Sequence, residues 1–142
     1  MRVTRRRGFH LPSSAHGRLV LIVEDHPETR QMYGDYLRSA GLRVHDAADG
    51  RTGVEQAAQV RPDVILMDLA MPGLTGWEAT RRIRRDPVLA RVPVIAITAY
   101  GGVGFEFLAA EAGCDRLLTK PCRPLRVLHE IEDILLARKK EP

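Results

Sequence analysis

The sequence Asp-Val-Ile-Leu-Met-Asp-Leu-Ala-Met-Pro-Gly-Leu-Thr-Gly, residues 63–76, holds the strongest indication of the fold. Its four consecutive apolar residues, Val64–Met67, lie between two aspartates, and such a run is typical of a short strand buried on both faces. Pro72 and Gly73 then indicate a loop before the next helix. This stretch predicts one strand of a parallel sheet with an acidic side chain, Asp68, at its carboxyl end.

The alternation of short aliphatic runs and amphipathic segments recurs along most of the chain. Strands are predicted at residues 19–23, 43–46, 64–67, 94–98 and 116–119. Helices are predicted from about residue 27 to before Gly41, and at about 50–59, 76–85, 105–112 and 124–138. The fourth helix is expected to begin late because glycines crowd residues 100–104. Strand and helix repeated five times predict a doubly wound α/β fold, with a five-stranded parallel sheet and helices on both faces.

Polar side chains follow the predicted strands at the positions where chemistry occurs in such sheets. Glu24 and Asp25 follow the first strand, Asp68 the third, Thr98 ends the fourth, and Lys120 follows the fifth. The carboxyl ends of parallel strands share one edge, where ligands bind. We therefore expect three carboxylates, a hydroxyl and an ammonium group to converge there.

This set of groups predicts phosphoryl chemistry assisted by a metal ion. Crowded carboxylates raise one another's pKa values unless a cation neutralises them, and an all-oxygen site suits Mg²⁺, with Mn²⁺ as the alternative, better than Zn²⁺. A carboxylate beside such a metal can attack a phosphoryl group, while a lysine neutralises the transferring oxygens. Before residue 139, every Lys or Arg residue is arginine except Lys120, which indicates a chemical role for an ammonium group at this position.

Four stretches resemble the response-regulator receiver family of two-component signalling. They are Leu-Ile-Val-Glu-Asp at 21–25, the stretch at 63–76, Pro-Val-Ile-Ala-Ile-Thr-Ala at 93–99 and Leu-Leu-Thr-Lys-Pro at 117–121. The resemblance, to single-domain receivers such as the chemotaxis response regulator, implies a flavodoxin-like strand order of 2-1-3-4-5. It also implies a cis peptide bond before Pro121.

The resemblance assigns a role to each site residue. Asp68 would accept the phosphoryl group, with Thr98 and Lys120 as the catalytic residues that contact it. The metal ligands would be Asp25, Asp68 and the backbone carbonyl of Ala70, with Glu24 supporting the metal. The family commonly has an aromatic residue where this chain has Leu117, so we expect Tyr100 or Phe105 to couple Thr98 to the outer surface instead. Ala70 and Tyr100 also offer little help in orienting water, which favours a long-lived phosphoryl group.

The function implied by the resemblance is a signalling switch rather than a turnover enzyme, although the switch would catalyse its own phosphorylation and dephosphorylation. The phosphoryl donor would be a histidine kinase or a histidine phosphotransfer protein. Output would pass to an unidentified downstream protein, or to a second copy through the fourth helix, fifth strand and fifth helix. The alternative is a receiver-fold interaction module that works without phosphorylation. A phosphatase is disfavoured because Ala70 stands where a second acid would be needed.

Composition suggests how the chain is organised. The net charge of +4 comes from the N-terminal part, because residues 1–18 contain five arginines and no acidic residue. We expect a basic, disordered extension at 1–17, a receiver domain at 18–138 and a short tail at 139–142, with no attached DNA-binding domain. No apolar run approaches the roughly 20 residues that a membrane helix needs, and no secretory signal is present, so we expect a cytoplasmic protein.

Overall fold

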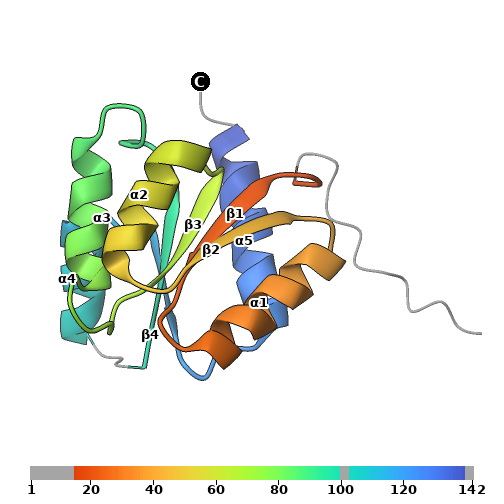
Figure 1. The fold of residues 1–142 in the computed structure, drawn as a ribbon, viewed down its shortest axis with the longest axis horizontal. Coiled ribbons are helices and arrows are strands. Elements are labelled where there is room, and N and C mark those ends of the chain that lie inside the picture. Colours follow the sequence, from red (N-terminus) through yellow and green to blue (C-terminus); the bar gives the residue numbers. More distant parts are fainter. Residues whose placement is uncertain (1–14, 100–102, 140–142) are drawn as a thin grey trace, which may run out of the picture.

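The computed structural model describes residues 15–99 and 103–139. Within these residues, strands and helices alternate along the chain (Figure 1). Their order is β1 (Leu19–Val23), α1 (Pro27–Ser39), β2 (Arg43–Ala47), α2 (Gly50–Val60), β3 (Val64–Asp68), α3 (Gly76–Arg85), β4 (Val94–Thr98), α4 (Val103–Ala112), β5 (Arg116–Thr119) and α5 (Pro124–Lys139).

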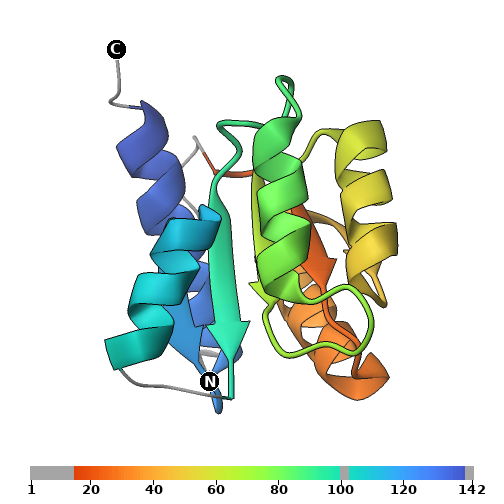
Figure 2. The same cartoon turned by 90° about the vertical axis from the view of Figure 1, so that its left-hand side faces the viewer.

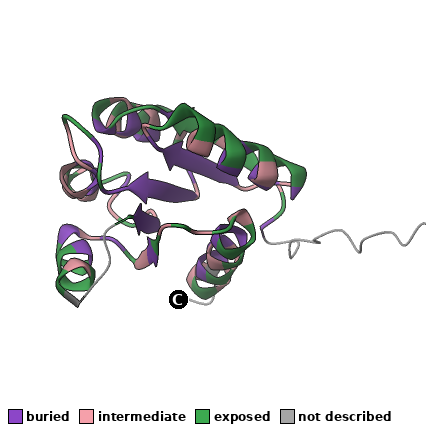
Figure 3. Ribbon diagram, turned by 90° about the horizontal axis from the view of Figure 1, so that it is seen from below, coloured by how far each residue is buried: buried purple, intermediate pink, exposed green. Residues whose placement is uncertain are grey.

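The strands form one parallel sheet in the order β2-β1-β3-β4-β5. This confirms the predicted doubly wound α/β fold with the flavodoxin-like strand order. Every residue of β1, β3 and β4 is buried, whereas the edge strands β2 and β5 expose several side chains (Figure 3). The continuous aliphatic runs therefore mark the three central strands, which are covered on both faces.

Helices cover the two faces of the sheet and create two apolar cores (Figure 2). The core beneath α1 and α5 includes Leu37 and Leu128. The core beneath α2, α3 and α4 includes Ala57, Ile83 and Ala109. Each helix therefore contributes an apolar stripe to one face, as the helical spacing of its apolar residues predicts.

The predicted bounds of β1, β4, β5, α1 and α3 are confirmed. Of the other elements, β2, α2, β3 and α5 end one residue later than predicted, and α4 begins two residues earlier. The largest difference concerns α4, which was predicted to begin at Phe105 but begins at Val103. Gly104 lies within this helix, and a Cβ atom added there would meet nothing within 4 Å. A glycine costs a helix only about 0.5–1 kcal/mol, which the packing of α4 against its neighbours offsets.

Residues 15–17 contact the amino edge of the sheet, the edge at which the strands begin. Ala15 is fully buried in the core between α1 and α5. The N–H of Gly17 donates to the carbonyl of Gly41 at 2.9 Å, and Nε of Arg43 donates to the Gly17 carbonyl at 2.8 Å. This segment is therefore held against the domain before β1 begins. Across the described residues, no helix combines the length and the apolar character needed to span a membrane.

Candidate metal and phosphorylation site

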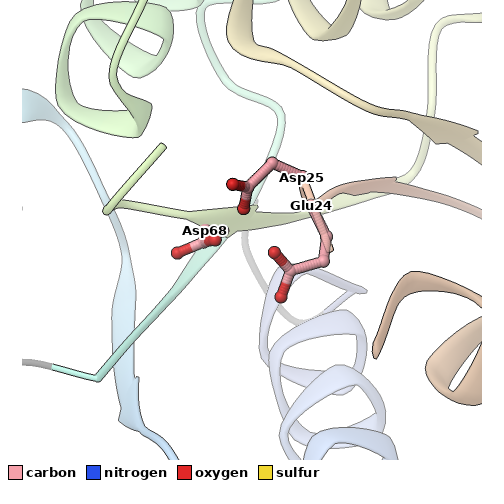
Figure 4. A group of neighbouring side chains, drawn as sticks. All are labelled: Glu24, Asp25 and Asp68. Atoms are coloured by element: carbon pink, nitrogen blue, oxygen red, sulfur yellow. The ribbon is translucent and has the colours of Figure 1, made fainter. Parts of the chain in front are cut away.

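Three acidic side chains meet at the carboxyl edge of the sheet, where the strands end. Glu24 and Asp25 follow β1, and Asp68 is the last residue of β3. Figure 4 shows their carboxyl groups beside one another. One oxygen of each group lies within 4.8 Å of the others. The structure thus brings together the three carboxylates that the sequence predicts at this edge.

Lys120, the residue after β5, reaches the same cluster. Its Nζ lies 2.6 Å from Oε1 of Glu24 and 3.6 Å from Oδ2 of Asp68. Burial alone would lower the pKa of Lys120, but its hydrogen bond to Glu24 and the charge of Asp68 outweigh burial and raise the pKa. The ammonium group is therefore charged and bridges the two acids. The peptide bond between Lys120 and Pro121 is cis, which confirms the expectation from the resemblance.

The cluster opposes the ionisation of Glu24 but favours that of Asp25. Glu24 is only 2% exposed, and burial together with the neighbouring Asp68 raises its pKa to about 7, although Lys120 acts in the opposite direction. Burial also opposes the ionisation of Asp25, but interactions with Glu24 and Asp68 outweigh it and lower the pKa of Asp25. Asp25 is therefore ionised more readily than Glu24. A cation bound beside these carboxylates would favour their ionised forms and offset the free-energy cost of ionising Glu24.

One oxygen of the cluster lacks a hydrogen-bond partner. Among the described residues, Oδ1 of Asp25 is the buried side-chain nitrogen or oxygen atom that has no hydrogen-bond partner. Buried polar atoms are normally bonded, so this oxygen is available as a ligand. Carboxylate oxygens are also the ligands that Mg²⁺ and Mn²⁺ prefer in proteins. The residues present therefore fit a hard divalent cation.

The other predicted site residues border the cluster. Ala70 is exposed, and its N–H donates to Oδ1 of Asp68 at 3.1 Å. The loop at residues 69–75 between β3 and α3 therefore turns back toward the Asp68 carboxylate. Thr98 is buried at the end of β4, and the register pairs its neighbour Ile97 with Asp68. Thr98 therefore lies one residue past the β4 residue that pairs with Asp68, at the same edge of the sheet.

Sequence reasoning missed Arg30, which contacts the segment carrying the acids. Nη1 of Arg30 donates a hydrogen bond to the backbone carbonyl of Glu24 at 2.8 Å, and its Nε lies 3.9 Å from Oδ2 of Asp46. Arg30 thereby links the ends of β1 and β2. The sequence offers one indication of this contact, which is that Arg30 follows Asp25 by five residues in the first turns of α1. The direction of α1 in the fold then brings the Arg30 side chain to the Glu24 carbonyl.

The residues expected to couple Thr98 to the outer surface are only partly described. Tyr100 lies outside the described residues. The ring of Phe105 lies 6.1 Å from that of Trp77, centroid to centroid, so this aromatic residue of α4 contacts α3. Leu117 is partly buried against the core beneath α2, α3 and α4. Coupling through Tyr100 or Phe105 stays a prediction.

The site geometry agrees with the comparison to protein families. A model of the response regulator receiver domain matches residues 20–132, which include the acids, Thr98 and Lys120. The chain belongs to the response regulator receiver domain family. It is therefore a receiver of two-component signalling, the assignment that the four sequence stretches predicted.

Two relatives place this receiver within the family. It is 32% identical to the polar-differentiation response regulator DivK of Brucella anthropi over 116 residues, which is 82% of this chain and 94% of DivK. It is 34% identical, again over 82% of its length, to the DNA-binding dual master transcriptional regulator RpaA of Synechocystis, but spans only 48% of RpaA.

A solved structure bears on the metal. The receiver domain of sensor histidine kinase PA1611 from Pseudomonas aeruginosa, crystallised with a magnesium ion coordinated in its active-site cleft, is 37% identical, with a TM-score of 0.77. The match covers 84% of this chain and 98% of that domain.

Proposed function

We propose that this receiver accepts a phosphoryl group on the carboxylate of Asp68 in a reaction that requires Mg²⁺. The observation that carries the proposal is the cluster itself: three carboxylates within 4.8 Å, a charged lysine between two of them, and a buried Asp25 oxygen without a partner. The magnesium in the PA1611 receiver domain supports the choice of metal.

Each residue has a separate task in this proposal. Asp25, Asp68 and the backbone carbonyl of Ala70 would hold the ion, with Glu24 in support, and the bound ion would neutralise charge on the phosphoryl oxygens. An oxygen of Asp68 attacks phosphorus while the leaving group departs from the opposite side. Lys120, already 3.6 Å from Asp68, moves its ammonium group from Glu24 to a phosphoryl oxygen. The Thr98 hydroxyl moves toward the phosphoryl group and donates a hydrogen bond to it.

The proposed signalling role extends from this chemistry. A histidine kinase or a histidine phosphotransfer protein supplies the phosphoryl group, and the receiver works as a switch that catalyses its own phosphorylation and dephosphorylation. Phosphorylation changes the population of two conformations of the surface near α4, β5 and α5, which a downstream protein or a second copy then recognises. We further propose a receiver domain at 18–138, between an extension at 1–17 and a tail at 139–142, although residues 15–17 pack against the domain and α5 reaches Lys139. We also propose that the protein acts in the cytoplasm.

Intact-mass spectrometry with a small-molecule phosphodonor tests the proposal. Acetyl phosphate and Mg²⁺ should add one phosphoryl group to the wild-type protein and none to Asp68→Asn. Chelating the metal should abolish the gain, and Lys120→Met should slow it. If the wild-type protein gains no mass from acetyl phosphate or from a histidine kinase, the phosphorylation-independent interaction module becomes the better explanation.

A further inference from the structure

The first turn of α2 lies directly against the loop that follows the acceptor strand. Gly50 begins this helix and is buried. A Cβ atom at position 50 would lie 3.1 Å from the carbonyl carbon of Leu74 and closer still to its oxygen. Leu74 belongs to the loop at residues 69–75. A backbone carbonyl cannot move aside as a flexible side chain can, so any side chain at position 50 displaces either α2 or this loop.

The same loop is held from its other side by the end of β3. A Cβ atom at position 76 would lie 2.7 Å from Cα of Leu69 and would overlap the carbonyl oxygen of Asp68. The N–H of Gly76 also donates to the carbonyl of Leu69 at 3.3 Å. The loop is therefore confined between its own strand and α2. It carries Ala70, whose N–H already contacts the Asp68 carboxylate at 3.1 Å.

Asp49 fixes the turn that makes this contact. Its Oδ1 accepts a hydrogen bond from the N–H of Thr52 at 2.8 Å, and its Oδ2 accepts one from the Thr52 hydroxyl at 3.1 Å. Such a cap satisfies a backbone donor that the first turn would otherwise leave open. Without the cap, the first turn of α2 frays, and the surface that supports Leu74 becomes loose.

We propose that Asp49 and Gly50 are positioning residues for the acceptor site. Together they hold the first turn of α2 against Leu74, which keeps the loop at residues 69–75, and with it the Ala70 backbone, in place for metal binding. The inference rests on the proposed function, because it assigns a role in the Mg²⁺ site to a helix that contributes no ligand. Groups that orient metal ligands in this way commonly change metal affinity by about 10- to 100-fold when they are altered.

A pair of substitutions at position 49 separates the cap from the charge. Asp49→Ala removes both, whereas Asp49→Asn removes the charge but keeps a side chain that caps helices about as well. Mg²⁺ affinity is measured by following the Ala70 amide in ¹H–¹⁵N NMR spectra during a titration with MgCl₂. We expect Asp49→Ala to weaken Mg²⁺ binding about tenfold and Asp49→Asn to stay within about twofold of wild type. Equal affinities of Asp49→Ala and Asp49→Asn would overturn the inference.

A second pair tests the contact itself. Gly50→Ala presses on the Leu74 backbone, whereas Gly53→Ala, in the same helix, meets the side chain of Val23 at 2.8 Å instead. Both should lower the melting temperature, but only Gly50→Ala should weaken Mg²⁺ binding and shift the amide signals of residues 69–75. If the two variants bind Mg²⁺ equally well, the positioning role is refuted. If the wild-type protein itself does not bind Mg²⁺, the proposed metal site fails, and the positioning role fails with it.

Discussion

Replacing Glu24 with glutamine should stabilise the metal-free protein. The pKa of Glu24 is raised from its usual 4.5 to about 7, first by burial and then by Asp68. An acid whose pKa is raised by folding binds its proton more tightly in the native state. The contribution of Glu24 to the free energy of unfolding is therefore highest below pH 4.5, falls as the pH rises from 4.5 to 7, and stays reduced above pH 7.

The size of the effect follows from the same values. Each unit by which a pKa is raised corresponds to about 1.4 kcal/mol, so ionised Glu24 lowers the stability above pH 7 by about 3 kcal/mol. Glutamine carries no charge at any pH and can still accept a hydrogen bond from Lys120. Because an amide replaces a protonated carboxyl imperfectly, we expect Glu24→Gln to gain about 2 kcal/mol at pH 8 and little or nothing at pH 4.5.

Urea unfolding followed by circular dichroism, in the presence of EDTA at several pH values, measures this difference. Asp35→Asn is the matched control, because it also removes one carboxylate but from a side chain that is 66% exposed. The control should change the free energy of unfolding by less than about 0.5 kcal/mol at any pH. A Glu24→Gln protein that is less stable than wild type at pH 8, or that gains equally at both pH values, would refute the reasoning. Under the proposed function, Mg²⁺ should then stabilise the wild type more than the variant.

Three further outcomes follow from the structure. Arg84→Met should lower the free energy of unfolding, measured in urea, by about 3 kcal/mol, because the Arg84 guanidinium donates to several carbonyls and to a carboxylate. Arg82 is exposed on the same helix, so Arg82→Met should lower it by less than about 0.5 kcal/mol. Gly104→Ala should raise the stability by about 0.5–1 kcal/mol, since space is open at that position; a lower melting temperature would contradict this. A thiol reagent should modify Cys122 in the native protein and Cys114 only on unfolding, because Cys114 is buried whereas Cys122 is partly exposed; equal rates in native protein would contradict this.

The fold was predictable because its signals are local. Continuous aliphatic runs such as Val64–Met67 identify strands buried on both faces, and the turns between them contain Gly and Pro. The acidic cluster was predictable for a related reason: a parallel sheet aligns all strand ends at one edge, so chain order alone brings Asp25 and Asp68 together. The predicted start of α4 was two residues too late, because tertiary packing offset the weak helix propensity of Gly104.

The contacts that sequence reasoning could not find join residues far apart in the chain. Gly50 resembles any glycine at a helix start until the position of Leu74 is known. Arg84 belongs to a run of four arginines at residues 81–85, a pattern that is typical of a solvated helix surface. Only the fold shows that its Nε donates to the carbonyl of Gly113 at 2.9 Å and one Nη to Asp115 at 2.9 Å. Residue type and spacing therefore indicate candidates for chemistry, whereas the positioning contacts require the three-dimensional arrangement.

The two edges of the sheet differ in how charge is arranged, and the difference suits a switch. At the carboxyl edge, three acids gather around the ammonium group of Lys120, and burial, followed by Asp68, raises the pKa of Glu24. At the amino edge, opposite charges pair: Asp63 with Arg18 at 3.1 Å, and Asp115 with both Arg84 and Arg138 at 2.9 and 3.1 Å.

Asp63 and Asp115 also accept bonds from the backbone N–H groups of Leu19 and Val94, at 2.7 and 2.8 Å, so these acids fix the starts of β1 and β4. Under the proposed function, a sheet held in this way at one edge could accommodate a metal ion or a phosphoryl group at the other. Neutralising Glu24 should therefore stabilise the metal-free domain, whereas breaking the Asp115 pairs should destabilise it whether or not metal is bound.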